Sequence, residues 1–275
     1  MSEEVRLNAY FERIGFAGSI APTAETLAAL HALQPAAIPF ENLDGLLGRP
    51  VLLDQASLDR KLLGGRRGGY CFELNMLFLR VLRELGFESR GHLARVLSGG
   101  SGGARSRPDH MLVTVDVDGT NYLADVGFSG PLQTAPLRLR PGEQEALLGT
   151  YRLSGEGPAM LLEFRRHGGE WRRLYEFSLE EVDAGSCAAA SDELNADPQW
   201  FLRRNLLVER TNPRGRWQLF NGRLRTDTAE AGEAREIGSV AGLREVLAET
   251  FGVDLAGLDG LDETLAAILD RTDAD

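Results

Sequence analysis

A β-hairpin is predicted at residues 110–126, where the sequence reads HMLVTVDVDGTNYLADV. Its centre, Asp118-Gly119, is typical of a two-residue type I′ turn, and apolar residues alternate with other side chains on both sides of it. A turn of this type fixes the strand register, so Val117 is expected to pair with Thr120. Any fold of this chain must therefore accommodate one antiparallel ribbon with a defined inner and outer face.

The same register predicts that His110 and Asp125 are neighbours. Asp125 falls opposite Leu112, and His110 shares a face with Leu112 because strand side chains alternate. The backbones of His110 and Asp125 are then about 7–8 Å apart as diagonal neighbours. A bulge or a slip of one residue would separate them, and a histidine satisfied by backbone groups beside a strand-end aspartate is the alternative.

One face of this ribbon is almost entirely apolar. We expect that face to pack on the core of the β-domain, which would direct the face of His110 and Asp125 toward another domain. The apolar face carries Met111, Val113, Val115, Val117, Tyr122, Ala124 and Val126.

The whole chain is predicted to be α+β, with helical, β and mixed parts in that order. Helical periodicity dominates residues 1–90, with helices expected at Ser2–Ile14, at Ala24–Leu33 after a Thr23 cap, and from Cys71 onward. Alternation typical of an antiparallel barrel or curled sheet covers residues 91–195. Residues 196–275 are expected to form a small α/β part, with a helix at 199–206, a hairpin turning at Asn221-Gly222, and helices at 240–250 and 262–269.

Cys71 is a candidate nucleophile because it begins an amphipathic helix. Apolar residues recur at intervals of three and four from Leu74 to Leu85, and Gly86 ends the pattern. Free N–H groups and the helix dipole at an N-terminus favour a thiolate, and would lower the pKa of a cysteine there. Gly68 and Gly69 are expected to leave the sulfur uncovered. The alternative is a small buried apolar residue, which is the interpretation we give to Cys187.

Net charge, the N-terminal segment and the few cysteines and histidines argue against nucleic-acid-binding, secreted, membrane-spanning and metal-binding proteins. The formal charge of −11 disfavours nucleic acid as a partner. The N-terminal segment has no apolar core typical of a secretory signal, and no stretch is long enough to span a membrane, so a cytoplasmic protein is expected. Two cysteines cannot build a disulfide framework, and the four scattered histidines give no metal-ligand spacing.

Three motifs resemble those of the arylamine N-acetyltransferase family, in the same order and at similar spacings. They are RGGYCFELN, DHMLV and YLADVGF. Flanking segments also resemble that family: YFERIGF at 10–16, IPFENLD at 38–44 and FLRRNLLVER at 201–210. The match extends over most of the chain and is loose only in the C-terminal helices and in the loop at 98–108.

The resemblance implies an N-terminal helical bundle, a central antiparallel β-barrel and a C-terminal α/β lid, with a Cys-His-Asp triad of the papain or transglutaminase type. It assigns Cys71 as nucleophile, His110 as proton acceptor and donor, and Asp125 as the residue that orients His110. It also implies that Phe40 and Phe128 line the acyl and amine pocket, although Phe40 is equally suited to the core. A structural ion pair is implied between Arg67 and Glu41.

The resemblance further implies N-acetylation of aromatic amines or hydrazines by acetyl-CoA, in a ping-pong reaction through acetyl-Cys71. Acetyl-CoA would be the acyl donor and no metal would be needed. Ser106 and Phe201 are candidate CoA contacts, with plain surface or packing roles as the alternative. Three other functions remain open: an amide synthase that moves a longer acyl chain, a thioester hydrolase, and a binding protein that has lost the chemistry. The oligomeric state is not predicted.

Overall fold

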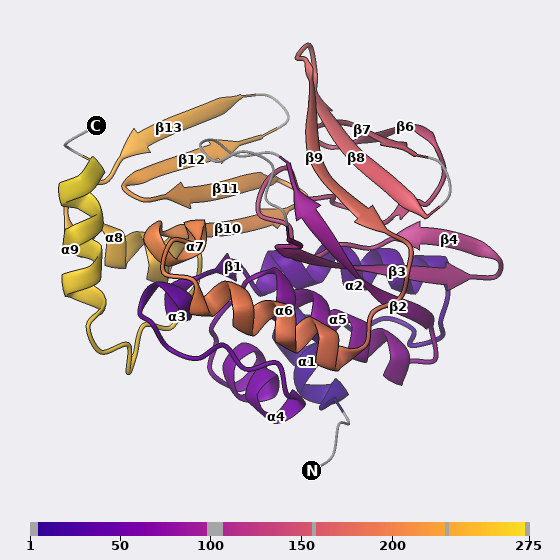
Figure 1. Ribbon diagram of the computed structural model, residues 1–275, viewed down its shortest axis with the longest axis horizontal. Helices are drawn as coiled ribbons and strands as arrows, with labels where there is room; N and C mark the ends of the chain where they lie inside the picture. The colour runs from indigo at the N-terminus through magenta and orange to yellow at the C-terminus, as the bar shows by residue number, and fades with distance from the viewer. Residues whose placement is uncertain (1–4, 98–106, 156–157, 229–230, 273–275) are drawn as a thin grey trace.

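The computed structural model describes residues 5–97, 107–155, 158–228 and 231–272, and it is α+β as predicted (Figure 1). The N-terminal part is helical. Thr23 accepts a hydrogen bond from the Thr26 N–H and so caps the second helix, which continues to Ala37, past the expected end. The first helix was expected from Ser2, but residues 1–4 lie outside the described residues and the helix begins at Leu7. The helices are α1 (Leu7–Ile14), α2 (Ala24–Ala37), α3 (Leu43–Leu46), α4 (Gln55–Leu58), the π-helix η1 (Asp59–Gly64) and α5 (Cys71–Glu84).

The central part is a nearly closed antiparallel β-barrel. Its eight strands are hydrogen-bonded in the order β5-β4-β3-β2-β9-β8-β7-β6. Side-chain hydrogen bonds between Gln144 and the backbone of Arg138 link the two edge strands, β6 and β5. The strands are β2 (Glu88–Val96), β3 (His110–Val117), β4 (Thr120–Leu123), β5 (Leu137–Arg138), β6 (Gly142–Ala146), β7 (Gly149–Ser154), β8 (Ala159–Arg166) and β9 (Trp171–Ser178).

The C-terminal part is a five-stranded antiparallel sheet packed against helices (Figure 1). Its edge strand β1 comes from the N-terminal part of the chain and pairs with β10. The hairpin turn at Asn221-Gly222 is confirmed, whereas the helix expected at 199–206 is only one turn long. The elements are β1 (Phe40–Glu41), α7 (Phe201–Arg204), β10 (Leu207–Asn212), β11 (Gly215–Phe220), β12 (Arg223–Asp227), β13 (Gly232–Glu236), α8 (Val240–Glu245), η2 (Val246–Thr250) and α9 (Leu261–Thr272).

The predicted hairpin register is confirmed. Val117 pairs with Thr120, and Asp118 and Gly119 have φ values of 51° and 79°, as a type I′ turn requires. The second strand was expected to continue to Val126, but β4 ends at Leu123. One further backbone bond, from the Ala124 N–H to the Val113 carbonyl at 2.9 Å, continues the ladder. Beyond Ala124, side chains take over the hydrogen bonds, as described for the site below.

The expected orientation of the hairpin is wrong. Its apolar face packs on α5, outside the barrel, in one cluster with the helical core. The face of His110 instead points into the barrel, where Leu112 and Leu123 belong to a separate cluster. The alternation of apolar residues could not show which face of the hairpin points into the barrel, because almost every residue of β3 is buried, on both faces.

One further helix, α6 (Ala184–Ala196), was not predicted. Asp183 caps it by accepting from the Ser186 N–H, and Cys187 and Leu194 join the core cluster around α5. Figure 1 shows α6 running across the outside of α5. The boundaries expected near residues 90 and 195 stay predictions.

Candidate active site

Cys71 is the first residue of α5 and its side chain is almost fully buried. The two preceding glycines are needed for a different reason from the one expected. A Cβ on Gly68 would lie 2.2 Å from the Pro39 carbonyl oxygen, and one on Gly69 would lie 2.9 Å from Glu73. Close packing against β1 and the first helical turn, rather than access to the sulfur, therefore requires glycine here.

His110 and Asp125 are in direct contact, as the register predicts. His110 Nε2 lies 2.7 Å from Asp125 Oδ2, and both side chains are buried. The imidazole also packs between two aromatic rings of the barrel interior, with centroid distances of 5.3 Å to Phe128 and 5.1 Å to Tyr175. The imidazole is thus held by two aromatic rings and by the Asp125 carboxylate, which is hydrogen-bonded to its Nε2.

Asp125 is held by two further donors. Its Oδ1 accepts from Asn75 Nδ2 at 2.9 Å and from the Gly127 N–H at 3.0 Å. Burial acts to raise the pKa of Asp125, but the charge of His110 and these hydrogen bonds outweigh burial and lower it. Asp125 is therefore a carboxylate across the neutral range.

Asn75 links the helix to the barrel. Its Nδ2 also donates to the Met111 carbonyl at 2.7 Å, and its Oδ1 accepts from the Val126 N–H at 3.1 Å. These side-chain bonds, with the Gly127 bond to Asp125, replace the strand ladder after Ala124. Gly127 is required because a Cβ there would lie 3.0 Å from the Cys71 Cα.

Cys71 lies beside this pair. Its Sγ is 3.8 Å from the carbonyl oxygen of Asp109, the residue before His110. Burial acts to lower the pKa of His110, whereas the charge and hydrogen bond of Asp125 and those of Cys71 raise it, and the net result is a pKa of about 10. Because Asp125 occupies Nε2, Nδ1 is the imidazole nitrogen left for the sulfur. A protonated imidazole beside a thiol favours the nucleophilic thiolate.

The raised pKa of His110 predicts how stability depends on pH. Protonated His110 is favoured in the folded state, so its contribution is complete below the unfolded pKa of about 6.5 and is lost as the pH rises through about 10. Between pH 6.5 and 10 the free energy of unfolding of the wild type should fall by at least about 2 kcal/mol relative to that of His110→Gln. Denaturant unfolding at half-unit pH steps measures this difference. A constant difference across the range would contradict the protonated pair.

The residues predicted to contact substrate or CoA lie in different parts of the fold. Phe128 is buried next to His110, whereas Phe40 is buried in the helical core cluster and pairs with Glu209 of β10. Phe201 stacks on the partly exposed Phe220, with centroids 5.8 Å apart. Ser106 lies outside the described residues. The roles in substrate and CoA binding stay predictions.

Two other expectations about individual side chains can be compared with the structure. Arg67 forms the expected ion pair with Glu41, with a nitrogen–oxygen distance of 2.7 Å. Cys187 is buried in α6, where burial raises the pKa of its thiol to about 11. This thiol is suited to packing rather than to attack.

Sequence analysis did not single out Asn75 or Tyr175. The spacing offered one signal for Asn75, which lies four residues after Cys71 and therefore on the same side of α5. Tyr175 carried no such signal, because β9 reaches the site only through the strand order of the barrel.

Metal-binding clusters and membrane-spanning helices are both absent from the residues that the structure describes. Within them, no three His, Cys, Asp or Glu side chains are placed to share a metal ion. Over the same ranges, no helix has both the length and the apolar character to span a membrane.

Comparison with known proteins gives consistent matches over nearly the whole chain. A family model described as N-acetyltransferase matches residues 23–259. The Salmonella typhimurium arylamine N-acetyltransferase / N-hydroxyarylamine O-acetyltransferase is 40% identical over 250 residues, which cover 90% of this chain and 88% of that protein. The Escherichia coli K12 arylamine N-acetyltransferase matches with the same identity and the same coverage.

Solved structures agree with these sequence matches. The arylamine N-acetyltransferase from Salmonella typhimurium aligns with a TM-score of 0.87 at 38% identity, covering 96% of this chain and 98% of that one. The Mycobacterium marinum arylamine N-acetyltransferase in complex with CoA aligns with a TM-score of 0.88 at 33% identity and the same coverage.

Proposed function

Because this chain belongs to the arylamine N-acetyltransferase family, we propose that it transfers the acetyl group of acetyl-CoA to arylamines and arylhydrazines through an acetyl-Cys71 thioester. It is an acyltransferase. The observation that carries the proposed mechanism is the buried His110–Asp125 pair at 2.7 Å, beside a cysteine at the N-terminus of α5. A nucleophile, a base and a residue that orients the base are the parts that covalent acyl transfer needs.

In the first half-reaction, Cys71 Sγ attacks the acetyl carbonyl carbon of acetyl-CoA. The new carbon–sulfur bond forms, the bond to the CoA sulfur breaks, and the CoA thiolate takes a proton from the His110 imidazolium. One thioester replaces another, so the acetyl group remains activated. CoA then departs and leaves room for the amine.

In the second half-reaction, the amine nitrogen attacks the acetyl-Cys71 carbonyl carbon. His110 accepts the proton that the nitrogen loses, and the bond to Cys71 Sγ breaks. The product amide is more stable than a thioester, so this step runs downhill. Two successive half-reactions that share one covalent intermediate give ping-pong kinetics.

Asp125 serves both steps by holding the imidazole. Its carboxylate accepts a hydrogen bond from the Nε2–H, fixes the ring, and stabilises the imidazolium that each step forms or consumes. Phe128 and Tyr175 press on the same ring and surround it with apolar surface. A dry environment protects the intermediate from hydrolysis.

The chemistry requires a free thiol. The proposed location is therefore the cytoplasm, whose reducing conditions keep cysteines unpaired. Both cysteines of the chain are free.

Incubation with acetyl-CoA alone tests the proposal. We expect a burst of one equivalent of free CoA and a gain of one acetyl group on the peptide that contains Cys71. Addition of an arylamine should then release the acetylated amine and restart CoA release. Cys187→Ala, which removes the other buried thiol, should retain the burst, whereas Cys71→Ala should lose it.

Other outcomes would identify the other functions. Steady CoA release without an amine would indicate a thioester hydrolase, and a burst only with longer acyl thioesters would indicate an amide synthase. No acylation by any thioester would contradict the proposed transfer and favour a binding protein.

A further inference from the structure

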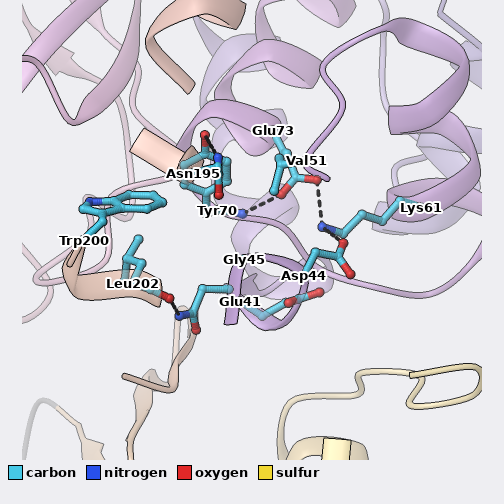
Figure 2. Close-up of a pocket in the computed structure, with 11 residues that line it drawn as sticks. Glu41, Asp44, Gly45, Val51, Lys61, Tyr70, Glu73, Asn195, Trp200 and Leu202 are labelled. Carbon is cyan, nitrogen blue, oxygen red and sulfur yellow. Dashed lines mark hydrogen bonds and ion pairs between the residues drawn. The ribbon is translucent and has the colours of Figure 1, made fainter. Parts of the chain in front are cut away.

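A cluster of five charged side chains lies next to the first turn of α5. It consists of Glu41 and Glu73, which are buried, and Asp44, Lys61 and Arg67, which are partly buried; we call it the charge cluster. Lys61 Nζ lies 2.6 Å from Asp44 Oδ2 and 2.7 Å from Glu73 Oε1. Figure 2 shows the Lys61 ammonium between these two carboxylates. Arg67 completes the cluster by forming ion pairs with both Glu41 and Asp44.

Glu73 connects this cluster to the proposed nucleophile. It is the third residue of α5, and its Oε2 accepts from the Tyr70 N–H at 3.0 Å. Figure 2 shows this bond between Tyr70 and Glu73. Because Tyr70 immediately precedes Cys71, the bond sets the orientation of the backbone that carries the cysteine. A Cβ at position 69 would lie 2.9 Å from Glu73 Oε2, so glycine at this position leaves the space that the carboxylate occupies.

The charged state of Glu73 depends on Lys61. Burial raises the pKa of Glu73, and the charge of Glu41 raises it further, while the charge and hydrogen bond of Lys61 and the Tyr70 N–H oppose the rise. Of the titratable and charged side chains that face the pair, Asp44 from α3 and Glu41 from β1 are acidic, and Arg67 is the second cation. The adjoining cavity measures only about 10 Å³, room for about one water molecule, so solvent adds little screening.

We propose that Lys61 is a positioning residue for acyl transfer: its ammonium keeps the Glu73 carboxylate charged, and this carboxylate holds the Tyr70–Cys71 segment in the reactive geometry. The role rests on the proposed function of Cys71 as nucleophile. Lys61 is the only lysine in a chain with 30 basic residues. A compact ammonium suits the position, since it contacts two carboxylates from different elements without the planar geometry that a guanidinium demands.

The first test is alkylation of Cys71 by iodoacetamide, in a Cys187→Ala background so that one thiol remains. Lys61→Met should slow the reaction at pH 7 by at least about tenfold, because a buried Glu73 without its cation takes up a proton and weakens as an acceptor. The deficit relative to the wild type should shrink as the pH rises and Glu73 ionises. Arg244→Met, which breaks the exposed pair with Asp262, should react like the wild type.

Two matched double variants isolate the acceptor atom. Lys61→Met/Glu73→Gln and Lys61→Met/Glu73→Leu both lack the two charges and have similar volumes, but only glutamine can accept from the Tyr70 N–H. Glutamine offers a neutral acceptor, as protonated Glu73 does, so this variant should alkylate about tenfold more slowly than the wild type with no added pH dependence, whereas the leucine variant should be slower still at every pH. Because both doubles avoid a lone buried charge, they decide the question even if Lys61→Met does not fold.

Equal rates in the two doubles would overturn the proposal, as would a folded Lys61→Met with the alkylation profile of the wild type. The CoA burst, measured separately, distinguishes this result from failure of the proposed function. A wild type that gives no burst while the doubles differ would refute acetyl transfer and retain the positioning role.

Discussion

Replacing Asp125 with asparagine is expected to slow acetylation of Cys71 by about 10³- to 10⁴-fold with little change in the fold. The reason lies in the donors around Oδ1. Asn75 Nδ2 and the Gly127 N–H both point at this atom, so the amide oxygen of the introduced side chain must take its place. The amide nitrogen then faces His110 Nε2.

This orientation reverses the hydrogen bond to the imidazole. An amide nitrogen can only donate, so Nε2 must be unprotonated and the proton moves to Nδ1. A protonated Nδ1 in a neutral ring cannot accept the thiol proton, and the ring also loses the carboxylate that favours its cationic form. The variant therefore keeps the fold, but its His110 can no longer act as the base for Cys71.

The size of the CoA burst and its rate constant, followed by rapid mixing, measure this effect. Asp116→Asn is the matched control, because Asp116 lies on the same hairpin and its Oδ1 accepts from Gly119 at the turn. Acetylation of Asp125→Asn at even a tenth of the wild-type rate would exclude Asp125 from orienting the base.

Replacing Asn75 with leucine is expected to lower the free energy of unfolding by about 4 kcal/mol. The change removes three buried hydrogen bonds, one of them to the charged Asp125. It also frees the Val126–Gly127 segment from α5, so the burst rate of any folded fraction should fall by about 100-fold.

Denaturant unfolding at pH 7 measures the stability change, and rapid mixing with acetyl-CoA measures the rate. Asn121→Leu makes the same substitution at an exposed position of β4 and should alter neither quantity. A stability loss below about 1 kcal/mol with a normal burst would show that α5 and the barrel are joined by other contacts.

Local patterns predicted the elements and part of the site. The Asp118-Gly119 turn set the register of β3 and β4, and this register brought His110 to Asp125. The spacing of apolar residues after Cys71 defined α5 and placed the cysteine in its first turn. These predictions hold because turn geometry and helical periodicity depend on residues that are close in sequence.

The orientation of the hairpin could not be predicted in the same way. The apolar face of β3 was expected inside the β-domain, yet it covers α5, while His110 points into the barrel. In a strand packed between a barrel interior and a helix, both faces are buried, so hydrophobicity does not identify the inner one.

The sequence by itself determined which residues are candidates for the chemistry, because local backbone geometry placed Cys71 at the start of a helix and His110 beside Asp125 on a hairpin, and the family resemblance then assigned their roles. Only the tertiary structure revealed what holds them: Asn75 across the gap between α5 and the barrel, Tyr175 on the imidazole, and Lys61 behind Glu73. Such contacts join segments distant along the chain. Their geometry follows from how the elements pack, which no local pattern encodes.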